Sequence, residues 1–487
     1  MPKQLHSSGH NGCVPENAYH TVPYLTVPRF ETHPDRLAAV ATMFGMKPAP
    51  VRACRVLEIG CGDANNLIPM AYHLPESRFV GIDLADQAIA AARRMIDALG
   101  LANIEVIAAD LRAIGENFGE FDYVIAHGLY SWVPAEVRDA LMAITGARLA
   151  PQGVAFISYN ANPGRHIRQM LREMMLYHTR HAGDVHERVE QGRWLLEWLG
   201  KTRLVRASWR GLLDEEIENL LERREDSLAH DDLGACNDAF YFHEVAEHAC
   251  THGMQYLGDA SNRQAFDVHG GLSWLGEDAV ERAQYLDFMH LRVFGETLLC
   301  RAEVPLTRAL DVTVFERMSF SCSARLVDGQ IEGLNGVRLT AGQANVEPVA
   351  LALGRNYPMP VPFDELLQHA ESRDALRNTL AAMVFTSFAQ YHVHDFACHR
   401  TVSERPAASH LARYHARESL RVPTVRHGLV ELDEPGRQLL LLLDGTRDLD
   451  LIAHDLANCP GAPPEEEIRR ALPDSLEWMA RMGLLEG

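Results

Sequence analysis

The sequence has 487 residues, with 46 basic and 66 acidic side chains and a formal net charge of −20 at pH 7. This length predicts several domains, and an apolar fraction of 47% is sufficient for ordinary packed cores. The negative charge argues against a nucleic-acid partner, because neutralising phosphates requires a net basic face.

Membrane and disulfide signals are weak in this sequence. No stretch approaches the roughly 20 apolar residues that a membrane span needs, and the polar start MPKQLHSSGH lacks the apolar core of a signal peptide. The nine cysteines include no C-x-x-C pair, so they indicate neither a disulfide framework nor a thiolate zinc site. We therefore expect a cytoplasmic protein without a membrane span.

The first predicted elements form an α/β pattern. A segment rich in tyrosine, proline and histidine (18–45) should end in a helix opened by Pro34. Short apolar runs then alternate with amphipathic stretches. The runs, each about as long as a buried strand, are 55–60, 78–83, 104–110, 121–127 and 153–160. The stretches with helical spacing are 64–74, 85–99 and 134–149. This alternation predicts a parallel sheet with helices on both faces.

The rest of the chain reads as mostly helical. Residues 163–310 have helical spacing, and 311–355 contain strand-like pieces punctuated by glycine. Two compact helical units follow near 356–400 and 425–487, with a linker at 401–424 that contains Pro406 and Pro423. We predict four domains, which cover residues 1–204, 205–310, 311–400 and 401–487.

The segment VLEIGCGDANN (56–66) predicts a nucleotide-type site. Gly60 permits a tight turn after the strand, and Gly62 lets the backbone approach a ligand where a Cβ would collide. Asp83 ends the next strand, 21 positions after Gly62, which is the usual spacing for a carboxylate that accepts both ribose hydroxyls. Asp110, at the end of the third strand, can reach an adenine amino group.

The charges of this loop select among ribose cofactors. A dinucleotide fold favours G-x-G-x-x-G, but Asn65 occupies the third glycine position here. Glu58 and Asp63 would repel a pyrophosphate, whereas they suit a ligand with an ammonium and a sulfonium, as S-adenosyl-L-methionine has. A glycine turn in a Rossmann-like domain without a cofactor is the structural alternative.

With these motifs the sequence resembles the class I S-adenosylmethionine-dependent methyltransferases. From about residue 20 to about residue 450 it resembles bacterial methyltransferases that carry a methyltransferase regulatory domain, a group that includes protein lysine methyltransferases of outer-membrane proteins. The matching segments include VPYLTVPRFETHPDRLA, EIGCGDANNLIPMA, FDYVIAHGLYSWVP, HDDLGACNDAFYFHEVAEHACTHGMQYL and LLLLLDGTRDLD. The resemblance implies a Rossmann-like class I methyltransferase domain, a helical regulatory domain and C-terminal winged-helix-like modules.

The resemblance also bears on the site residues. It favours a flap over the cofactor that includes Tyr19, Tyr24 and His33. The predicted cofactor-binding residues, in the flap and at the predicted strand ends, are Tyr24, His33, Glu58, Gly60, Cys61, Gly62, Asp63, Asn66, Asp83, Leu84, Asp110, Leu111 and His127.

The sequence departs from the family in two places. Ala64 stands where the family has glycine, at little cost if its φ is negative. Asn162 and Arg165 stand where the family has aromatic residues. If those aromatics line the acceptor channel in relatives, the acceptor of this protein differs.

The predicted acceptor side lies on the loops after the fourth and fifth strands, because positioning supplies most of the catalysis in an in-line methyl transfer. The residues at these places are His127, Tyr130, Trp132, Tyr159 and Asn160. The three aromatics could form a channel for a lysine cation, and His127 could remove a proton. Packing is the alternative for each aromatic, and a scaffold role is the alternative for His127.

Two histidine-rich segments contain residue types that can bind a metal. His248 and His252 have the i, i+4 spacing of a helical metal pair in FYFHEVAEHACTH, but no third ligand is evident in the sequence. His392, His394, Cys398 and His399 cluster in YHVHDFACH. A structural role is the better interpretation of both, so we predict no metal.

The sequence thus predicts a methyltransferase, and the resemblance implies a protein side chain, lysine, as its methyl acceptor. Methylation of a small molecule is the alternative activity, and a non-catalytic cofactor-binding interaction protein is the alternative class. We further predict that a chain cut after residue 204 still binds the cofactor but no longer methylates a protein, because the remainder docks the acceptor.

Overall fold

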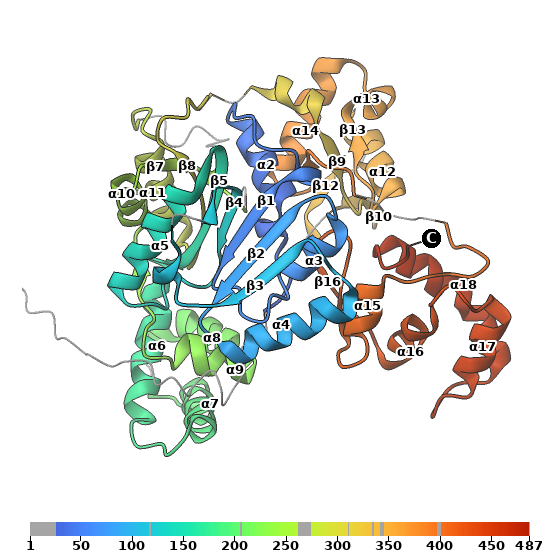
Figure 1. The fold of residues 1–487 in the computed structure, drawn as a ribbon, viewed down its shortest axis with the longest axis horizontal. Coiled ribbons are helices and arrows are strands. Elements are labelled where there is room, and N and C mark those ends of the chain that lie inside the picture. The colour runs from blue at the N-terminus through green and yellow to red at the C-terminus, as the bar shows by residue number, and fades with distance from the viewer. Residues whose placement is uncertain are drawn as a thin grey trace, which may run out of the picture.

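The computed structural model describes residues 26–115, 118–204, 207–261, 274–309, 311–333, 336–340, 345–396 and 401–486. An eight-stranded sheet in the order β3-β2-β1-β4-β5-β8-β7, with β6 paired to β5, lies at its centre (Figure 1). The strands are β1 (Arg55–Ile59), β2 (Arg78–Asp83), β3 (Ile104–Ala108), β4 (Phe121–Ala126), β5 (Leu149–Ala161), β6 (Ala239–Phe240), β7 (Met254–Asp259) and β8 (Phe294–Arg301). The first five are parallel, whereas β8 is antiparallel to both β5 and β7.

Helices cover both faces of this sheet, and alternate residues of each strand enter two separate cores. On one face Val56 and Ile125 pack with α2 (Pro34–Met43), α3 (Leu67–His73) and α4 (Asp86–Leu99). On the other face Leu57 and Val124 pack with α5 (Ala135–Arg148) and α10 (Phe242–Thr251). Side chains in a strand alternate between faces, so this division tells on which face a strand-end residue lies.

The predicted α/β core is confirmed element by element. Each of the five predicted strands and three predicted helices is present, with boundaries that differ by a few residues. The helix predicted at Pro34 begins there, and Pro134 lies at the N-cap of α5 rather than within its first turn.

The prediction that residues 163–310 are mostly helical is wrong for β6, β7 and β8. The helices of this region are α6 (Arg165–His178), α7 (Val185–Lys201), α8 (Ala207–Leu221), α9 (Glu225–Ser227), a π-helix (Leu228–Asp232), α10, and α11 (Ala279–His290). β8 pairs with β5 over Ala155–Asn160, so the chain on both sides of residue 204 builds one sheet. The four-domain division stays a prediction, and its first two units share this sheet.

Two modules follow the sheet. The first contains β9 (Ser319–Ser321), β10 (Arg325–Val327), β11 (Gln330–Glu332), β12 (Arg338–Thr340), α12 (Val346–Asn356), β13 (Val361–Pro362), α13 (Phe363–Leu366), α14 (Arg373–Phe385) and β14 (Gln390–His392). The second contains α15 (His410–His415), β15 (Arg421–Pro423), β16 (Leu429–Glu431), α16 (Glu434–Leu442), α17 (Leu449–Ala457) and α18 (Glu465–Arg481). Residues 401–424, predicted as a linker, therefore contain a helix and a strand.

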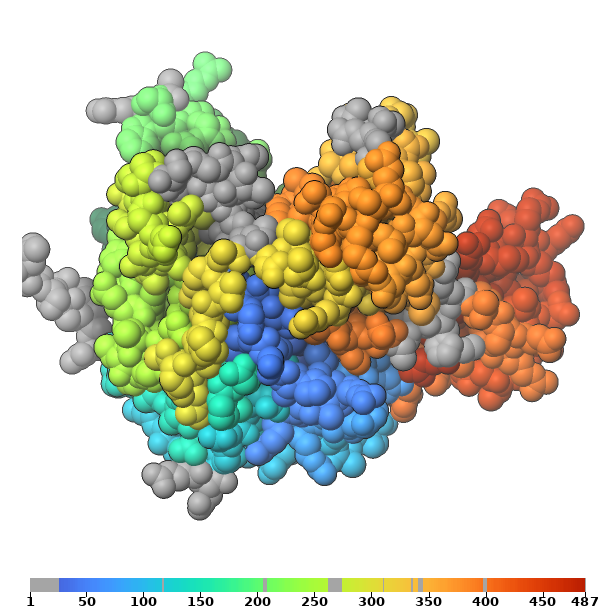
Figure 2. Space-filling view, turned by 90° about the horizontal axis from the view of Figure 1, so that it is seen from above, coloured from blue at the N-terminus to red at the C-terminus, as the bar shows by residue number. Residues whose placement is uncertain are grey.

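The two modules attach to the sheet differently. Phe315, Phe320 and Leu353 of the first module belong to the same apolar core as α2 and α3. The second module has its own core, which includes Leu440 and Leu476, and it projects at one end of the molecule (Figure 2, red). No helix among the described residues is long and apolar enough to cross a membrane.

Candidate cofactor and acceptor site

The loop after β1 has a backbone that requires glycine. Gly60 and Gly62 have φ values of +78° and +54°, and a Cβ at Gly62 would lie 2.8 Å from Cγ2 of Thr26. Ala64 has a φ of +56°, so the condition under which it costs little is not met. A left-handed alanine is unfavourable by about 1–2 kcal/mol, which makes Ala64 a strained residue of this loop.

Asp83 lies where the spacing predicts. Its Oδ2 accepts a hydrogen bond from the backbone N–H of Gly62 (2.8 Å), and its Oδ1 accepts one from that of Ala85 (2.8 Å). Each carboxylate oxygen has a further lone pair with which to accept from a ribose hydroxyl. The neighbouring Leu84 is 72% exposed, which leaves an apolar surface beside the carboxylate.

Asp110 is less available than predicted. Both of its carboxylate oxygens accept hydrogen bonds from Arg112 (2.5–3.1 Å), and this guanidinium lowers the pKa of Asp110. An adenine amino group would have to compete with Arg112. The adjacent Leu111 is 8% exposed.

Glu58 is buried beneath the loop with one oxygen unpaired. Its Oε1 accepts a hydrogen bond from Nδ2 of Asn66 (2.8 Å), and its Oε2 has no partner among the described residues. Burial is the main cause that raises the pKa of Glu58 to about 8, with smaller contributions from Asp63 and Asp83. A cationic ligand group would supply the missing partner for this carboxyl.

The segment before α2 covers the loop, and the contacts described for it come from Thr26 and Arg29. Thr26 donates its backbone N–H to Asp63 (3.2 Å) and also its hydroxyl, and the backbone N–H of Arg29 donates to Oδ1 of Asn66 (2.9 Å). These bonds use the Asp63 carboxylate to anchor the segment. Burial raises the pKa of Asp63, and the hydrogen bonds from Thr26 and Asn65 oppose this shift.

The contacts of the other predicted cofactor and flap residues differ from one another. His33 caps α2 by accepting from the N–H of Asp35 (3.1 Å) and packs against His427, so its contacts give no support to a cofactor role. The side chain of Cys61 lies in the apolar core, which leaves its backbone to shape the loop. Tyr19 and Tyr24 lie outside the described residues.

Buried polar atoms without a hydrogen-bond partner gather at the carboxyl ends of β1, β4 and β5. Of the thirteen such atoms among the described residues, six lie at or just after these strand ends: Glu58 Oε2, Asn65 Oδ1, His127 Nδ1, Trp132 Nε1, Asn160 Oδ1 and Asn162 Oδ1. Buried polar groups are nearly always paired in folded proteins, so such a group indicates a place for a ligand. This edge of the sheet is therefore the candidate site.

His127 is on the edge as predicted, but its environment does not favour a base. Its ring lies 6.0 Å from the rings of Phe156 and Phe294. Burial, with a smaller contribution from the charge of Arg29, lowers the pKa of His127 to about 3. An imidazole with this pKa takes up a proton poorly at neutral pH, so the scaffold alternative, or a hydrogen bond to a ligand, fits better.

Two of the three residues of the predicted aromatic channel lie inside one core of the sheet. Tyr130 and Tyr159 pack in the core beneath α5 and α10, and are 2% and 0% exposed. The Tyr130 hydroxyl bonds to Nδ1 of His248 (2.9 Å) and that of Tyr159 to Thr297 (3.3 Å). Packing is therefore the observed role of both tyrosines, whereas the half-buried Trp132 keeps an unpaired indole N–H at the edge.

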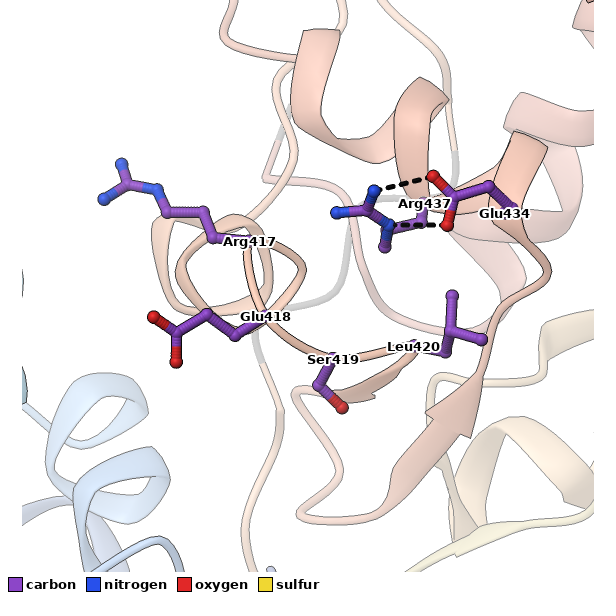
Figure 3. Close-up of a pocket in the computed structure, with 6 residues that line it drawn as sticks. All are labelled: Arg417, Glu418, Ser419, Leu420, Glu434 and Arg437. Atoms are coloured by element: carbon purple, nitrogen blue, oxygen red, sulfur yellow. Dashed lines mark hydrogen bonds and ion pairs between the residues drawn. The ribbon is translucent and has the colours of Figure 1, made fainter. Parts of the chain in front are cut away.

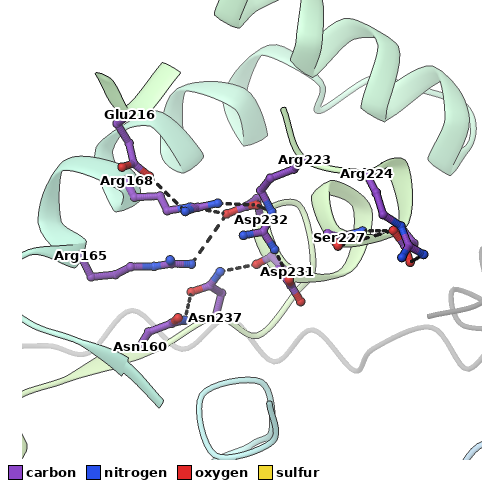
Figure 4. A network of polar contacts seen from close by, with 11 residues as sticks. Asn160, Arg165, Arg168, Glu216, Arg223, Arg224, Ser227, Asp231, Asp232 and Asn237 are labelled. Atoms are coloured by element: carbon purple, nitrogen blue, oxygen red, sulfur yellow. Dashed lines mark hydrogen bonds and ion pairs between the residues drawn. The ribbon is translucent and has the colours of Figure 1, made fainter. Parts of the chain in front are cut away.

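A polar network ties the end of β5 to the helical segment (Figure 4). Nδ2 of Asn160 donates a hydrogen bond to Oδ1 of Asn237 (2.8 Å). Nδ2 of Asn237 in turn donates to the carbonyl oxygen of Asp231. Arg165 lies 3.7 Å from Asp232, to which Arg168 also donates (2.9 Å). Arg165, at a position that is aromatic in the family, thus serves this buried ion pair, while Asn160 is held with Oδ1 unpaired.

Two charged residues near the site were missed by the sequence analysis. Arg29 lies close enough to lower the pKa of both His127 and Glu296. Glu296 in β8 pairs with Ser158, and burial raises its pKa to about 8. Neither residue is part of a recognisable sequence motif. Arg29 lies in an irregular segment, and Glu296 lies in a strand that was not predicted.

A separate pocket lies in the second module. It is lined by Arg417, Glu418, Ser419, Leu420, Glu434 and Arg437 (Figure 3). Arg437 donates to both oxygens of Glu434 (2.6 and 2.9 Å), which satisfies both charges. None of these residues belongs to the predicted site.

The histidine cluster of YHVHDFACH has a structural role where it is described. His392 is buried between Asp35 (2.7 Å) and Ser321 (2.8 Å), and Asp35 also accepts the backbone N–H groups of Val393 and His394. This network fastens α2 to β14. Cys398 and His399 lie outside the described residues.

Comparisons with known proteins agree with this fold. Residues 56–153 match a family described as "Methyltransferase domain", residues 224–301 match "Predicted methyltransferase regulatory domain", and residues 404–459 match "PKMT, C-terminal winged helix domain". The structure of PKMT2 from Rickettsia typhi superposes with a TM-score of 0.85 over 96% of this chain and 100% of that one, at 24% identity. A second structure of PKMT2 is a complex with AdoHcy.

Two relatives from Rickettsia prowazekii are closer in sequence. The uncharacterized protein RP789 is 36% identical over 302 residues, which span 61% of this chain and 54% of that protein. The uncharacterized protein RP028 is 32% identical over 233 residues, which span 48% of this chain and 93% of that protein. The chain thus covers only about half the length of RP789 but nearly all of RP028.

The sheet, the glycine loop with Asp83 and the matched domains together define a class I methyltransferase. Within that class, the chain belongs to the family of PKMT-type methyltransferases, which join a methyltransferase domain to a regulatory domain and a C-terminal winged-helix domain.

Proposed function

We propose that this protein transfers a methyl group from S-adenosyl-L-methionine to a lysine side chain of a protein. The observation that carries the proposal is the group of unpaired buried polar atoms at the carboxyl edge of the sheet, beside a carboxylate spaced for a ribose. Open α/β sheets bind their ligands at this edge.

The residues present fit this cofactor. Asp83 would accept the ribose hydroxyls, and the exposed Leu84 with Leu111 would pack on the adenine. The unpaired Glu58 Oε2 would accept from the ammonium group, and Arg29 would pair with the carboxylate of the methionine portion. When bound, the cofactor supplies a methyl group on a positively charged sulfur.

On the acceptor side the chain would position an amine and exclude water. Trp132 and Asn160 retain one unpaired polar atom each, with which they can orient the incoming side chain. His127, Glu58 and Phe294 lie on the face of the sheet that the Thr26–Arg29 segment approaches, so that segment would shield the reacting atoms. Glu296 adds a carboxyl near Arg29, which can accept a hydrogen bond from an incoming amine.

The proposal of a protein acceptor is supported by the matched PKMT domain and by the fold shared with PKMT2. Docking of a macromolecule also gives a reason for the large part of the chain outside the nucleotide core. An outer-membrane or surface protein as acceptor, and action in the cytoplasm, stay predictions from the sequence, as do the four-domain boundaries. Small-molecule methylation is the second candidate activity.

The first experiment identifies the acceptor class. The purified protein is incubated with methyl-labelled S-adenosylmethionine and a bacterial protein extract, and peptides are analysed for methylated lysine. We expect label in protein at lysine. Label that remains in small solutes would favour the second activity, and no transfer with intact cofactor binding would favour the non-catalytic class.

Two variants separate the halves of the site. Asp83→Ala should weaken cofactor binding at least tenfold, because both ribose hydrogen bonds are lost, and each hydrogen bond to a charged group contributes about 1.5–3 kcal/mol. Trp132→Ala should reduce turnover while cofactor affinity changes less than threefold, because Trp132 faces the acceptor. Calorimetry and initial rates give these values, and loss of cofactor binding in Trp132→Ala would make that residue part of the scaffold.

A further inference from the structure

Three side chains with metal-binding groups meet between α5 and α10, on the face of the sheet that these two helices cover. Asp139 comes from α5, and His248 and His252 come from the end of α10. The two helices approach so closely that a Cβ at Gly146 would lie 2.3 Å from the carbonyl oxygen of His252. Asp139, the third ligand that the sequence did not reveal, is 109 and 113 residues away from the two histidines.

The donor atoms of this group are close together. Oδ1 of Asp139 lies 3.2 Å from Nε2 of His248 and 2.9 Å from Nε2 of His252. One ligand atom from each residue can be chosen so that all three lie within 4.8 Å of one another. Tetrahedral zinc, with bonds of about 2.0–2.2 Å, places its ligand atoms about 3.4 Å apart. Small movements of these three side chains therefore suffice to seat an ion.

We propose that Asp139, His248 and His252 form a site for a divalent zinc-class ion, with water as the fourth ligand. Two imidazoles and one carboxylate suit zinc, whereas magnesium and calcium require oxygen ligands. The side chains are 65%, 22% and 19% exposed, so solvent can reach the fourth position and an ion can enter.

The surroundings supply the outer contact that zinc-binding histidines usually have. Nδ1 of His248 lies 2.9 Å from the buried hydroxyl of Tyr130. With zinc on Nε2, Nδ1 carries the ring proton and donates a hydrogen bond to the Tyr130 oxygen. This bond fixes the orientation of the ring and its tautomer. The ion would thereby join α5 and α10 to the loop after β4 and stabilise that face of the sheet.

The same distances also permit a plain hydrogen-bonded cluster, in which both histidines donate to Asp139. The two arrangements differ in their response to zinc. A hydrogen-bonded cluster gains nothing from the ion, whereas a site gains stability that grows with the concentration of free metal.

The test measures zinc binding by the full-length protein without a histidine tag. We expect one zinc per chain with micromolar or tighter affinity by competition with a chromophoric chelator. Cobalt should bind in its place and give the intense visible absorption of tetrahedral coordination. Asp139→Ala and His252→Ala should each weaken zinc binding at least tenfold, and Tyr130→Phe about tenfold, as for outer contacts of other zinc sites.

Two variants of α10 serve as controls. His243→Ala removes a histidine that bonds to Gln284 instead (3.0 Å), and Cys250→Ser removes an exposed thiol of the same helix. Both should bind zinc as the unaltered protein does. Zinc affinity unchanged in Asp139→Ala would mean that α10 alone holds the ion, and absence of stoichiometric binding would mean a hydrogen-bonded cluster; either result overturns the proposal.

Discussion

Glu58 illustrates how a single buried residue can favour ligand binding over stability. Its carboxyl has one hydrogen-bond partner, Asn66, and one unpaired oxygen, so burial raises its pKa to about 8. The folded protein therefore holds a proton on Glu58 that the unfolded chain releases above its ordinary pKa of 4.5. The contribution of Glu58 to stability is fully present below pH 4.5 and is lost as the pH rises toward 8.

This linkage predicts the behaviour of Glu58→Gln. Without ligand, the free energy of unfolding of the unaltered protein should fall between pH 5 and pH 8 relative to that of the variant, which has no carboxyl to ionise at this position. Denaturant titrations at several pH values measure the difference. Above about pH 8, where Glu58 is ionised in the folded protein, the variant should bind S-adenosylmethionine more weakly, because it lacks the carboxylate for the ammonium group.

Glu434→Gln is a suitable control for this prediction. Arg437 and Gln438 donate hydrogen bonds to the exposed Glu434 and lower its pKa to about 2, which lies below the pH range of the experiment. Its removal should leave the slope between pH 5 and pH 8 unchanged. Equal slopes for the unaltered protein and Glu58→Gln would show that Glu58 is already ionised in the folded state.

At the residue scale, the sequence predicted where a residue lies along the backbone better than it predicted what surrounds its side chain. Asp83 is where its spacing places it, because strand length and the sharp turn leave little freedom. Tyr130 and Tyr159 could not be assigned to a face, because the path of the loop and the parity of β5 were unknown. The positive φ of Ala64 is set by the loop as a whole, and the alanine accepts it.

At the element scale, the five strands β1 to β5 were predictable, and the later additions β6, β7 and β8 were not. β1 to β5 alternate with amphipathic helices over about a hundred residues, which is a local pattern. β8 lies within a region of helical spacing, and its partner β5 is more than a hundred residues earlier in the chain. Its strand conformation is determined by this tertiary pairing, which no local window of sequence reports.

The position of β8 changes the prediction for a chain cut after residue 204. Such a chain would lose β6, β7 and β8 and would expose the edge of β5 from Ala155 to Asn160. It would also lack Leu298 and Leu299 of β8, which fill part of the cores on opposite faces of the sheet. We now expect this chain to aggregate rather than to bind cofactor, because long unpaired strand edges associate.

A chain cut after residue 403 is the matched comparison. It keeps the whole sheet and loses the module that has its own core, so it should unfold cooperatively by circular dichroism. Soluble, cofactor-binding protein from the cut at 204 would show that the nucleotide core folds without β8.

At the scale of the whole molecule, Asn66 joins the glycine loop to the second module at the C-terminal end of the chain. Its Oδ1 accepts hydrogen bonds from the backbone of Arg29 (2.9 Å) and from Nε2 of His427 in the second module (2.9 Å). Its Nδ2 donates to Glu58 (2.8 Å). The N-terminal segment, the glycine loop and the C-terminal module therefore meet at one side chain, 361 residues from His427 along the chain.

This arrangement predicts that the C-terminal module influences cofactor binding without touching the cofactor. His427 is buried, and burial lowers its pKa to about 3, so it donates as a neutral imidazole throughout the physiological range. His427→Asn should preserve the left-handed backbone at this residue (φ +57°), which asparagine tolerates, while the shorter side chain loses contact with Asn66. We expect S-adenosylmethionine to bind about threefold to tenfold more weakly, which corresponds to the roughly 1 kcal/mol of one hydrogen bond.

A double-mutant cycle separates this coupling from a general loss of stability. If His427 acts through Asn66, the effects of His427→Asn and Asn66→Ala on cofactor affinity should be less than additive, because the two variants remove the same interaction. His415→Asn changes another histidine of the second module that burial keeps neutral, with its pKa lowered to about 4. Since His415 has no described contact with the loop, this control should leave cofactor affinity unchanged. Fully additive effects, measured by calorimetry on folded protein, would mean that the module and the loop act independently.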